Sequence, residues 1–134
     1  VSDRVASGLV GDLLVASPVE PAVLSPACTA AYFEGDGGNA TLAGAAGCPS
    51  GVANDTAEEF GIDGDVLVVV HAMDEPDPIG NASTVAVDTR YGTRTVELRR
   101  STTDPVRVDR GGVSVSQRLV SIEGTQYRLT VWVW

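Results

Sequence analysis

The sequence predicts an α+β fold, in which an N-terminal helix packs on an antiparallel sheet of about four to five strands. Two patterns predict it. An apolar stripe at helical spacing opens the chain, at Val1, Val5, Leu9 and Leu13. From Asp65 onward the apolar period changes to two, which is typical of strands. We expect residues 1–134 to form one domain with a disulfide-closed loop.

The first helix is expected over residues 1–15, with Val10 and Leu14 widening its apolar stripe. Pro18 ends it, because the residue before a proline is pushed out of the helical region. The stripe already includes Val1, and its phase is consistent with a longer helix cut on its N-terminal side. We therefore expect an apolar helix to precede residue 1.

Cys28 and Cys48 lie in a segment rich in Gly and Ala. Their spacing fits neither the paired clusters of zinc sites nor a redox Cys-x-x-Cys motif. We predict a disulfide between them, with two free buried thiols as the alternative. A disulfide implies an oxidising, extracytoplasmic setting. Within the loop that it closes, residues 30–33 are expected to form a short strand or a single turn.

A short helix over residues 55–60, capped by Asn54, separates this loop from the predicted strands. The strand at 65–73 is apolar on both faces and is expected at the centre of the sheet. The last two strands form a hairpin through a three-residue connection at Glu123-Gly124-Thr125, where Gly124 supplies a positive φ. The predicted strands cover residues 65–73, 84–91, 94–100, 113–122 and 126–134.

Acidic residues outnumber basic ones by 18 to 9, every basic residue is Arg, and the net charge is −9. This composition indicates a protein of high-salt environments, where salt screens the self-repulsion of an acidic surface. Codon bias in a GC-rich genome is the alternative explanation. The charge also makes duplex nucleic acid an unfavourable partner.

The charge is unevenly placed along the chain. Residues 1–89 hold 14 acidic residues and one Arg, whereas residues 90–134 hold 8 Arg and 4 acidic residues. Such polarity either steers head-to-tail contacts between subunits or is neutralised within one chain.

Three Asn-x-Ser/Thr sequons lie in Gly-, Asp- and Pro-rich stretches, at Asn39, Asn54 and Asn81. We predict that these asparagines are exposed and can carry glycans. Together with the predicted disulfide, they favour a location outside the cell.

Residues suited to catalysis are few. His71 is the only histidine, and its place within an apolar strand predicts a packed or edge-facing strand residue and not a general base. The acidic stretches at 63–65 and 74–77 could offer oxygen ligands to a hard cation, but neither matches a calcium-binding loop. We predict no enzymatic activity, metal, cofactor or small-molecule substrate.

The C-terminal strand has two different faces. Tyr127, Leu129, Val131 and Val133 alternate with a second set, Arg128, Thr130, Trp132 and Trp134. If the first set packs on the helix, both tryptophans lie on the outer face, where exposed aromatic residues commonly mark interfaces. We therefore predict an interface at Arg128, Trp132 and Trp134. The alternative is that the loop over residues 28–48 covers this face.

Both ends of the chain resemble haloarchaeal type IV pilin-like (pseudopilin) membrane-anchored surface proteins. The N-terminal resemblance lies in Asp3-Arg4-Val5-Ala6, Leu9-Val10-Gly11-Asp12-Leu13-Leu14, Pro21-Ala22-Val23-Leu24 and Cys28-Thr29-Ala30-Ala31-Tyr32-Phe33. The C-terminal resemblance lies in Val115-Ser116-Gln117-Arg118-Leu119-Val120 and Leu129-Thr130-Val131-Trp132-Val133-Trp134. The resemblance is weak between residues 35 and 109.

The resemblance implies an extracytoplasmic head domain behind an apolar helix that anchors the protein in the membrane. It further implies a structural subunit or minor component of a type IV pilus-like archaeal assembly, with itself or other pilin-like subunits as partners. A secreted or cell-surface binding module, such as an adhesin or receptor, is the alternative, favoured by the loop-rich segment 35–80. A secreted hydrolase is a third hypothesis.

Overall fold

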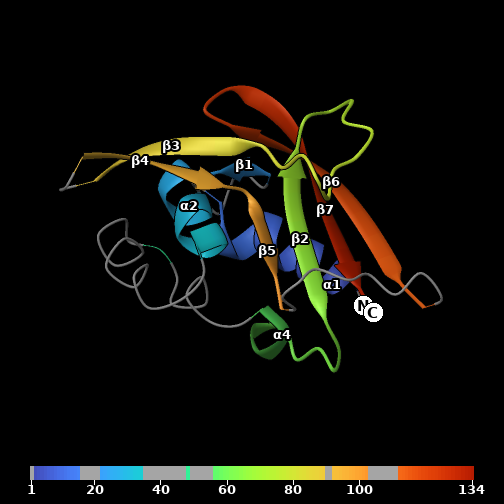
Figure 1. Cartoon of the computed structure of the whole chain (residues 1–134). Helices are drawn as coiled ribbons and strands as arrows, with labels where there is room; N and C mark the ends of the chain where they lie inside the picture. Colours follow the sequence, from blue (N-terminus) through green and yellow to red (C-terminus); the bar gives the residue numbers. More distant parts are fainter. Residues whose placement is uncertain (1, 16–21, 35–47, 49–55, 90–91, 103–111) are drawn as a thin grey trace.

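The computed structural model describes residues 2–15, 22–34, 48, 56–89, 92–102 and 112–134. These residues form an α+β fold (Figure 1). Its elements are α1 (Ser2–Gly8), the π-helical turn η1 (Leu9–Leu13), β1 (Val23–Leu24), α2 (Pro26–Glu34), α4 (Thr56–Glu59), β2 (Val66–His71), β3 (Thr84–Thr89), β4 (Gly92–Glu97), β5 (Arg99–Ser101), β6 (Ser114–Ile122) and β7 (Thr125–Val133). Among the described residues, no helix is both long enough and apolar enough to span a bilayer.

Five strands form one sheet in the order β1-β6-β7-β2-β5. All neighbours in it are antiparallel except β1 and β6. β3 and β4 form a separate two-stranded sheet. The predicted sheet of about four to five strands is therefore confirmed as an antiparallel-rich sheet of five strands, and the apolar segment β2 lies inside it with all six residues buried.

Two features of the sheets differ from the prediction. β1 lies in a segment without any predicted strand, and its two residues pair in parallel with Ser121 and Ile122. The predicted strand over 94–100 is divided at Leu98, where the chain bends. Leu98 is buried, its N–H donates to the Ser83 carbonyl, and its carbonyl accepts the Val70 N–H. β4 therefore stays with β3, while β5 joins β2.

β6 and β7 form the predicted hairpin, but its connection is shorter. Ile122 pairs with Thr125, so only Glu123 and Gly124 lie in the loop. Both have positive φ, 52° and 83°, as a type I′ turn requires, and this turn matches the right-handed twist of the strands. Thr125 is the first residue of β7 and not part of the turn.

The N-terminal helical segment ends two residues before the predicted end, at Leu13. Val5, Leu9, Val10 and Leu14 are buried as predicted. The last turn is π-helical, with the Leu14 N–H donating to the Leu9 carbonyl at 3.0 Å. Ser2 lies off this apolar stripe but is only 2% exposed. It is buried because its hydroxyl has hydrogen-bond partners on β6.

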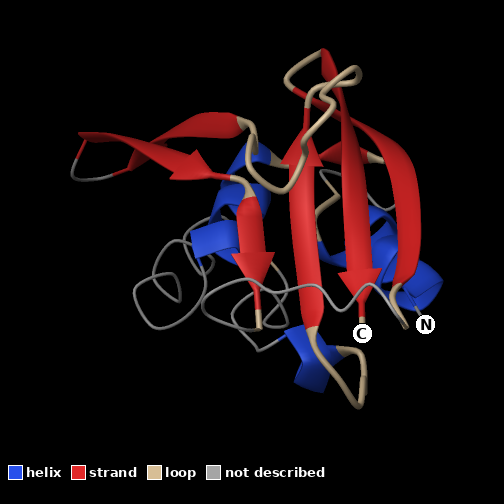
Figure 2. Cartoon of the chain, turned by 45° about the vertical axis from the view of Figure 1, so that its right-hand side comes forward, coloured by secondary structure: helices blue, strands red, loops and turns tan. Residues whose placement is uncertain are grey.

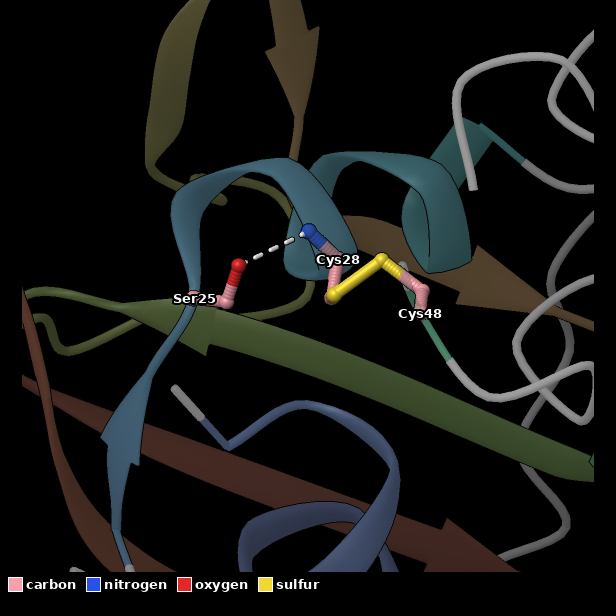
Figure 3. The surroundings of a disulfide bond; sticks show 3 residues. All are labelled: Ser25, Cys28 and Cys48. Atoms are coloured by element: carbon pink, nitrogen blue, oxygen red, sulfur yellow. Dashed lines mark hydrogen bonds between the residues drawn. A yellow bond between two sulfur atoms is a disulfide. The ribbon is translucent and has the colours of Figure 1, made fainter. Parts of the chain in front are cut away.

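The expectation of a strand or single turn at residues 30–33 is wrong, because these residues belong to the nine-residue helix α2. Pro26 occupies its first position, where the missing N–H is no loss. The Ser25 hydroxyl caps the helix by accepting the Cys28 N–H at 3.2 Å. The predicted disulfide is confirmed: Cys28 is bonded to Cys48, which ties α2 to the chain after it (Figure 3).

The helices α1 and α2 lie on one side of the sheet, behind it in Figure 2. α1 contacts β6 and β7, whereas α2 contacts β3, β4 and β5. The sheet face toward them belongs to the main apolar core, through Val66, Val68, Val70, Leu129, Val131 and Val133. The short helix α4 begins one residue after its predicted start, and its predicted cap Asn54 lies outside the described residues.

Candidate functional site

The face of the sheet turned away from the helices, called the outer face below, is the candidate site. Strand register sets its side chains in three rows across β6, β7 and β2: Val115-Trp132-Leu67, Gln117-Thr130-Val69 and Leu119-Arg128-His71. The β2 end of every row is buried. At the β6 end, Val115 is 50% exposed and Leu119 is 58% exposed. The outer face is therefore buried at β2 and exposed to solvent at β6.

The residues predicted as an interface are brought to this face by strand alternation. Trp132 and Trp134 are half-buried. Trp132 lies between Leu67 and Val115 in its row. The backbone of Trp134 continues the ladder by exchanging hydrogen bonds with Asp65, at 2.9 and 3.1 Å. Cys28 lies on the helix side in α2, and the loop residues 35–47, which were the alternative cover for this face, lie outside the described residues.

Arg128 is held by two contacts within the chain. Its Nε donates to the Met73 carbonyl at 3.0 Å, and its Nη1 donates to Gln117 Oε1 at 3.4 Å. The side chain therefore connects β7 with the segment after β2 and with β6. Arg128 is half-buried. Its two hydrogen bonds hold neighbouring segments of the outer face together, and its exposed part belongs to the surface of that face.

His71 is a buried strand residue, only 2% exposed. Its Nδ1 lies 3.0 Å from the Ala72 carbonyl oxygen, and its Nε2 lies 2.7 Å from Thr130 Oγ1. A carbonyl can only accept, so Nδ1 carries the hydrogen, and in the neutral ring Nε2 accepts from the Thr130 hydroxyl. Both ring nitrogens are thus hydrogen-bonded, and the bond from Nε2 to Thr130 joins β2 to β7.

A second polar cluster, missed at the sequence level, fastens the start of α1 to β6. Ser116 Oγ donates a short hydrogen bond to Asp3 Oδ1. Ser2 Oγ lies 2.7 Å from both Ser116 Oγ and Ser114 Oγ. Because a carboxylate only accepts, the direction of every bond in the series is set. Ser114 donates to Ser2, Ser2 donates to Ser116, and Ser116 donates to Asp3. The alternation of Ser114, Ser116 and Arg118 on the helix-facing side of a strand is the signal that could have revealed it.

The charge in this cluster belongs to Asp3 and Arg118. The hydrogen bond from Ser116 lowers the pKa of Asp3 below its ordinary value, and the contact with Arg118 lowers it further. Arg118 Nη2 lies 3.4 Å from Asp3 Oδ1 and 3.3 Å from Ser7 Oγ. The Asp3 side chain is 78% exposed, so this ion pair lies at the surface, beside the β6 edge.

Asn81 is the one sequon asparagine within the described residues, and it is exposed. Its Nδ2 donates to Glu75 Oε1 at 3.2 Å and to the Asp77 carbonyl at 3.3 Å. A glycan on Nδ2 would replace at least one of these bonds. Asn39 and Asn54 lie outside the described residues.

The acidic stretches make hydrogen bonds within the chain. Glu75 Oε1 also accepts the Asp77 N–H, and Asp65 Oδ1 accepts the Thr102 hydroxyl. Across the part of the chain that the structure describes, no three His, Cys, Asp or Glu side chains group as metal ligands would.

Residues 1–134 match a family of unknown function (DUF7287). No curated protein and no solved structure matches the chain. The function is therefore inferred from the side chains and surfaces described above.

Proposed function

We propose that this chain, which belongs to the DUF7287 family, is the head domain of a structural subunit or minor component of a type IV pilus-like archaeal surface assembly. The observation that carries the proposal is the position of α1. This helix lies along β6 and β7 on one face of an antiparallel-rich sheet, with Val5 and Leu9 buried. The resemblance to haloarchaeal pilin-like proteins implies this arrangement for a head domain.

In this proposal, an apolar helix precedes residue 1, anchors the protein in the membrane and drives assembly. α1 then continues that helix onto the head. Two kinds of contact join them: the apolar contacts of Val5 and Leu9 with the core, and the hydrogen bonds from Ser2 to Ser114 and Ser116. A load on the anchor would pass through α1 into the two longest strands of the sheet.

Three features support an extracytoplasmic setting at high salt. The Cys28–Cys48 disulfide is stable in oxidising compartments. Asn81 is exposed in its sequon. The net charge of −9 suits high salt. The partners would be copies of the chain or other pilin-like subunits, and the role would be structural, without catalysis.

The coding sequence immediately upstream of Val1 tests this proposal. We expect an apolar run of roughly 20 residues behind a short basic leader. A cleavable signal peptide ending just before Val1, or another folded domain there, would contradict the pilin-like role and favour the alternative below.

The alternative is a secreted or cell-surface binding module, and the β3–β4 sheet favours it. This two-stranded sheet extends away from the five-stranded sheet (Figures 1 and 2). Val85, Val87 and Val96 are buried, while the opposite face is exposed, at Thr84, Ala86, Thr95 and Glu97. If binding is the function, Thr95→Arg on this face should abolish attachment to target cells while the protein still folds. Unchanged attachment would exclude this surface.

A further inference from the structure

β6 carries an edge without a neighbouring strand among the described residues. β1 pairs only with its last two residues, Ser121 and Ile122. The Ser121 N–H donates to the Ala22 carbonyl at 2.9 Å, so it points away from β7. Along a strand, the N–H and C=O groups of successive residues point alternately to one side and to the other. The same edge therefore carries the N–H and C=O groups of residues 115, 117 and 119.

The side chains on this edge are unusually apolar for an exposed strand. Leu119 and Val115 are the most exposed of the large apolar residues that the structure describes. Both flank Gln117, which is also exposed. Among the described residues, the edge is protected at one point: Arg118 Nη1 donates to the Gln117 carbonyl at 2.9 Å. Proteins usually block such edges with charge, proline or a covering element.

We propose that this edge pairs with the same edge of a second copy of the chain, with the two β6 strands antiparallel about a two-fold axis at Gln117. In this register, residue 115 lies opposite residue 119 of the second copy, and the two Gln117 residues face each other. Each residue whose N–H and C=O point away from β7 then lies opposite another such residue of the second copy, as the hydrogen-bonded pairs of an antiparallel ladder require. A two-fold parallel pairing fails this condition, because it sets each outward-pointing residue opposite its own copy.

The side chains are complementary in the same register. On the outer face, Val115 contacts Leu119 of the second copy, so the two exposed apolar residues cover each other. On the helix-facing side, Arg118 of the second copy lies opposite Ser116. Ser116 is bonded to Asp3, so each exposed Asp3 carboxylate receives a second guanidinium. When Arg118 turns to the second copy, its hydrogen bond to the Gln117 carbonyl is broken, and this carbonyl can accept an N–H of the second copy. No two side chains of like charge lie opposite each other in this register.

The pairing has a direction that matters for the assembly. α1 runs the same way as β6, because Ser2 contacts Ser114 and Ser116 while Ser7 contacts Arg118. Antiparallel β6 strands therefore place the two helix starts at opposite ends of the dimer. If the proposed function holds, this contact joins heads from opposing filaments or cells, and not neighbours anchored in one membrane.

Salt should strengthen this pairing. Each copy carries a net charge of −9, so two copies repel one another, and the screening length falls from about 30 Å at 0.01 M salt to about 3 Å at 1 M. Most of the edge contacts are backbone hydrogen bonds and apolar side chains, which salt weakens little, whereas the contact between Asp3 and Arg118 of the second copy is the one that salt weakens. The chain should therefore be monomeric in dilute buffer and dimeric in molar KCl.

Sedimentation equilibrium of the oxidised chain tests the proposal. We expect a dimer in molar KCl, and Leu119→Lys should weaken it by at least about tenfold. The matched control is Met73→Lys, which places the same charge on an exposed apolar residue away from the edge and should leave the dimer intact. A wild-type monomer at every salt concentration, or equal loss with both variants, overturns the proposal.

A charge exchange tests the register itself. Asp3→Arg and Arg118→Asp should each weaken self-association, because like charges then face each other in direct contact, where molar salt screens them only in part. An equimolar mixture should form heterodimers, since each reversed charge meets its opposite on the other copy. Circular dichroism checks that both variants fold, and no heterodimer from folded variants refutes this register. Failure of this dimer would leave the proposed function standing, because membership in a filament does not depend on the dimer.

Discussion

Ser2 Oγ lies 2.7 Å from Ser116 Oγ, a buried hydrogen bond between side chains 114 positions apart. It joins the first turn of α1 to the beginning of β6, and it is part of the series of hydroxyl hydrogen bonds that ends on Asp3. The polar cluster therefore fixes the helix against the strand that also forms the exposed edge.

Replacing Ser2 by Ala should destabilise the protein by about 1–3 kcal/mol, because the buried hydroxyl of Ser116 and the half-buried hydroxyl of Ser114 each lose a partner. Urea unfolding followed by circular dichroism measures the free energy of unfolding. Ser7→Ala, on an exposed position of the same helix, is the control and should change it little. Equal effects of the two variants would contradict the fastening role of Ser2.

Asp3 should make stability depend on acid pH. Its folded-state pKa lies below the ordinary value of 3.8, so the carboxylate contributes stability that is fully present above that value. The contribution is lost as the pH falls through the folded-state pKa. An NMR titration of the Asp3 side chain should show the lowered pKa in the wild type. The Ser116→Ala variant should bring it back toward the ordinary value, and an unchanged pKa there would show that Ser116 is not the cause.

His71 and Thr130 should behave as a coupled pair. Either His71→Phe or Thr130→Val alone leaves a buried polar group without its partner and should cost about 1–3 kcal/mol of unfolding free energy. The double variant should cost less than the sum of the two single variants. A double-mutant cycle in urea measures this coupling, and strictly additive effects would mean that the hydrogen bond contributes nothing.

Removing the disulfide by the double substitution Cys28→Ser and Cys48→Ser should destabilise the chain by about 3 kcal/mol, because the bond closes a loop of about 20 residues. Thermal unfolding of the wild type with and without reductant provides the comparison. The double variant should match the reduced wild type and should not respond to reductant. A reductant effect that persists in the variant would have another origin.

The sequence predicts best where one local pattern determines the structure. β6 and β7 alternate regularly around Glu123-Gly124, and β2 is apolar on both faces, so these strands follow from residues close together in the chain. The predicted disulfide needed only the cysteine count and spacing. α2 was missed because its Ala-rich segment has no helical stripe, although Ser25 and Pro26 are a recognisable start signal.

The features that shape the candidate site depend on contacts between distant segments. Ser2 is buried by partners on β6, which a helical pattern cannot indicate. The bend at Leu98 follows from hydrogen bonds to Ser83 and Val70. The exposed edge results from β1 reaching only the last two residues of β6. Alternation along β7 agrees with the register that puts Trp132 on the outer face, whereas the exposure of Val115 and Leu119 follows from the strand order.

The most direct test of the proposed role is the composition of the surface filaments made by the source organism. Filaments would be purified from the parent strain and from a strain lacking this gene, imaged by electron microscopy and analysed by mass spectrometry. We predict that the chain is present in the parent filaments, and that filaments are lost, fewer or altered in shape in the deletion strain. Filaments that lack the chain and are unchanged by the deletion, together with a full-length protein that stays monomeric, would contradict the pilus-like role.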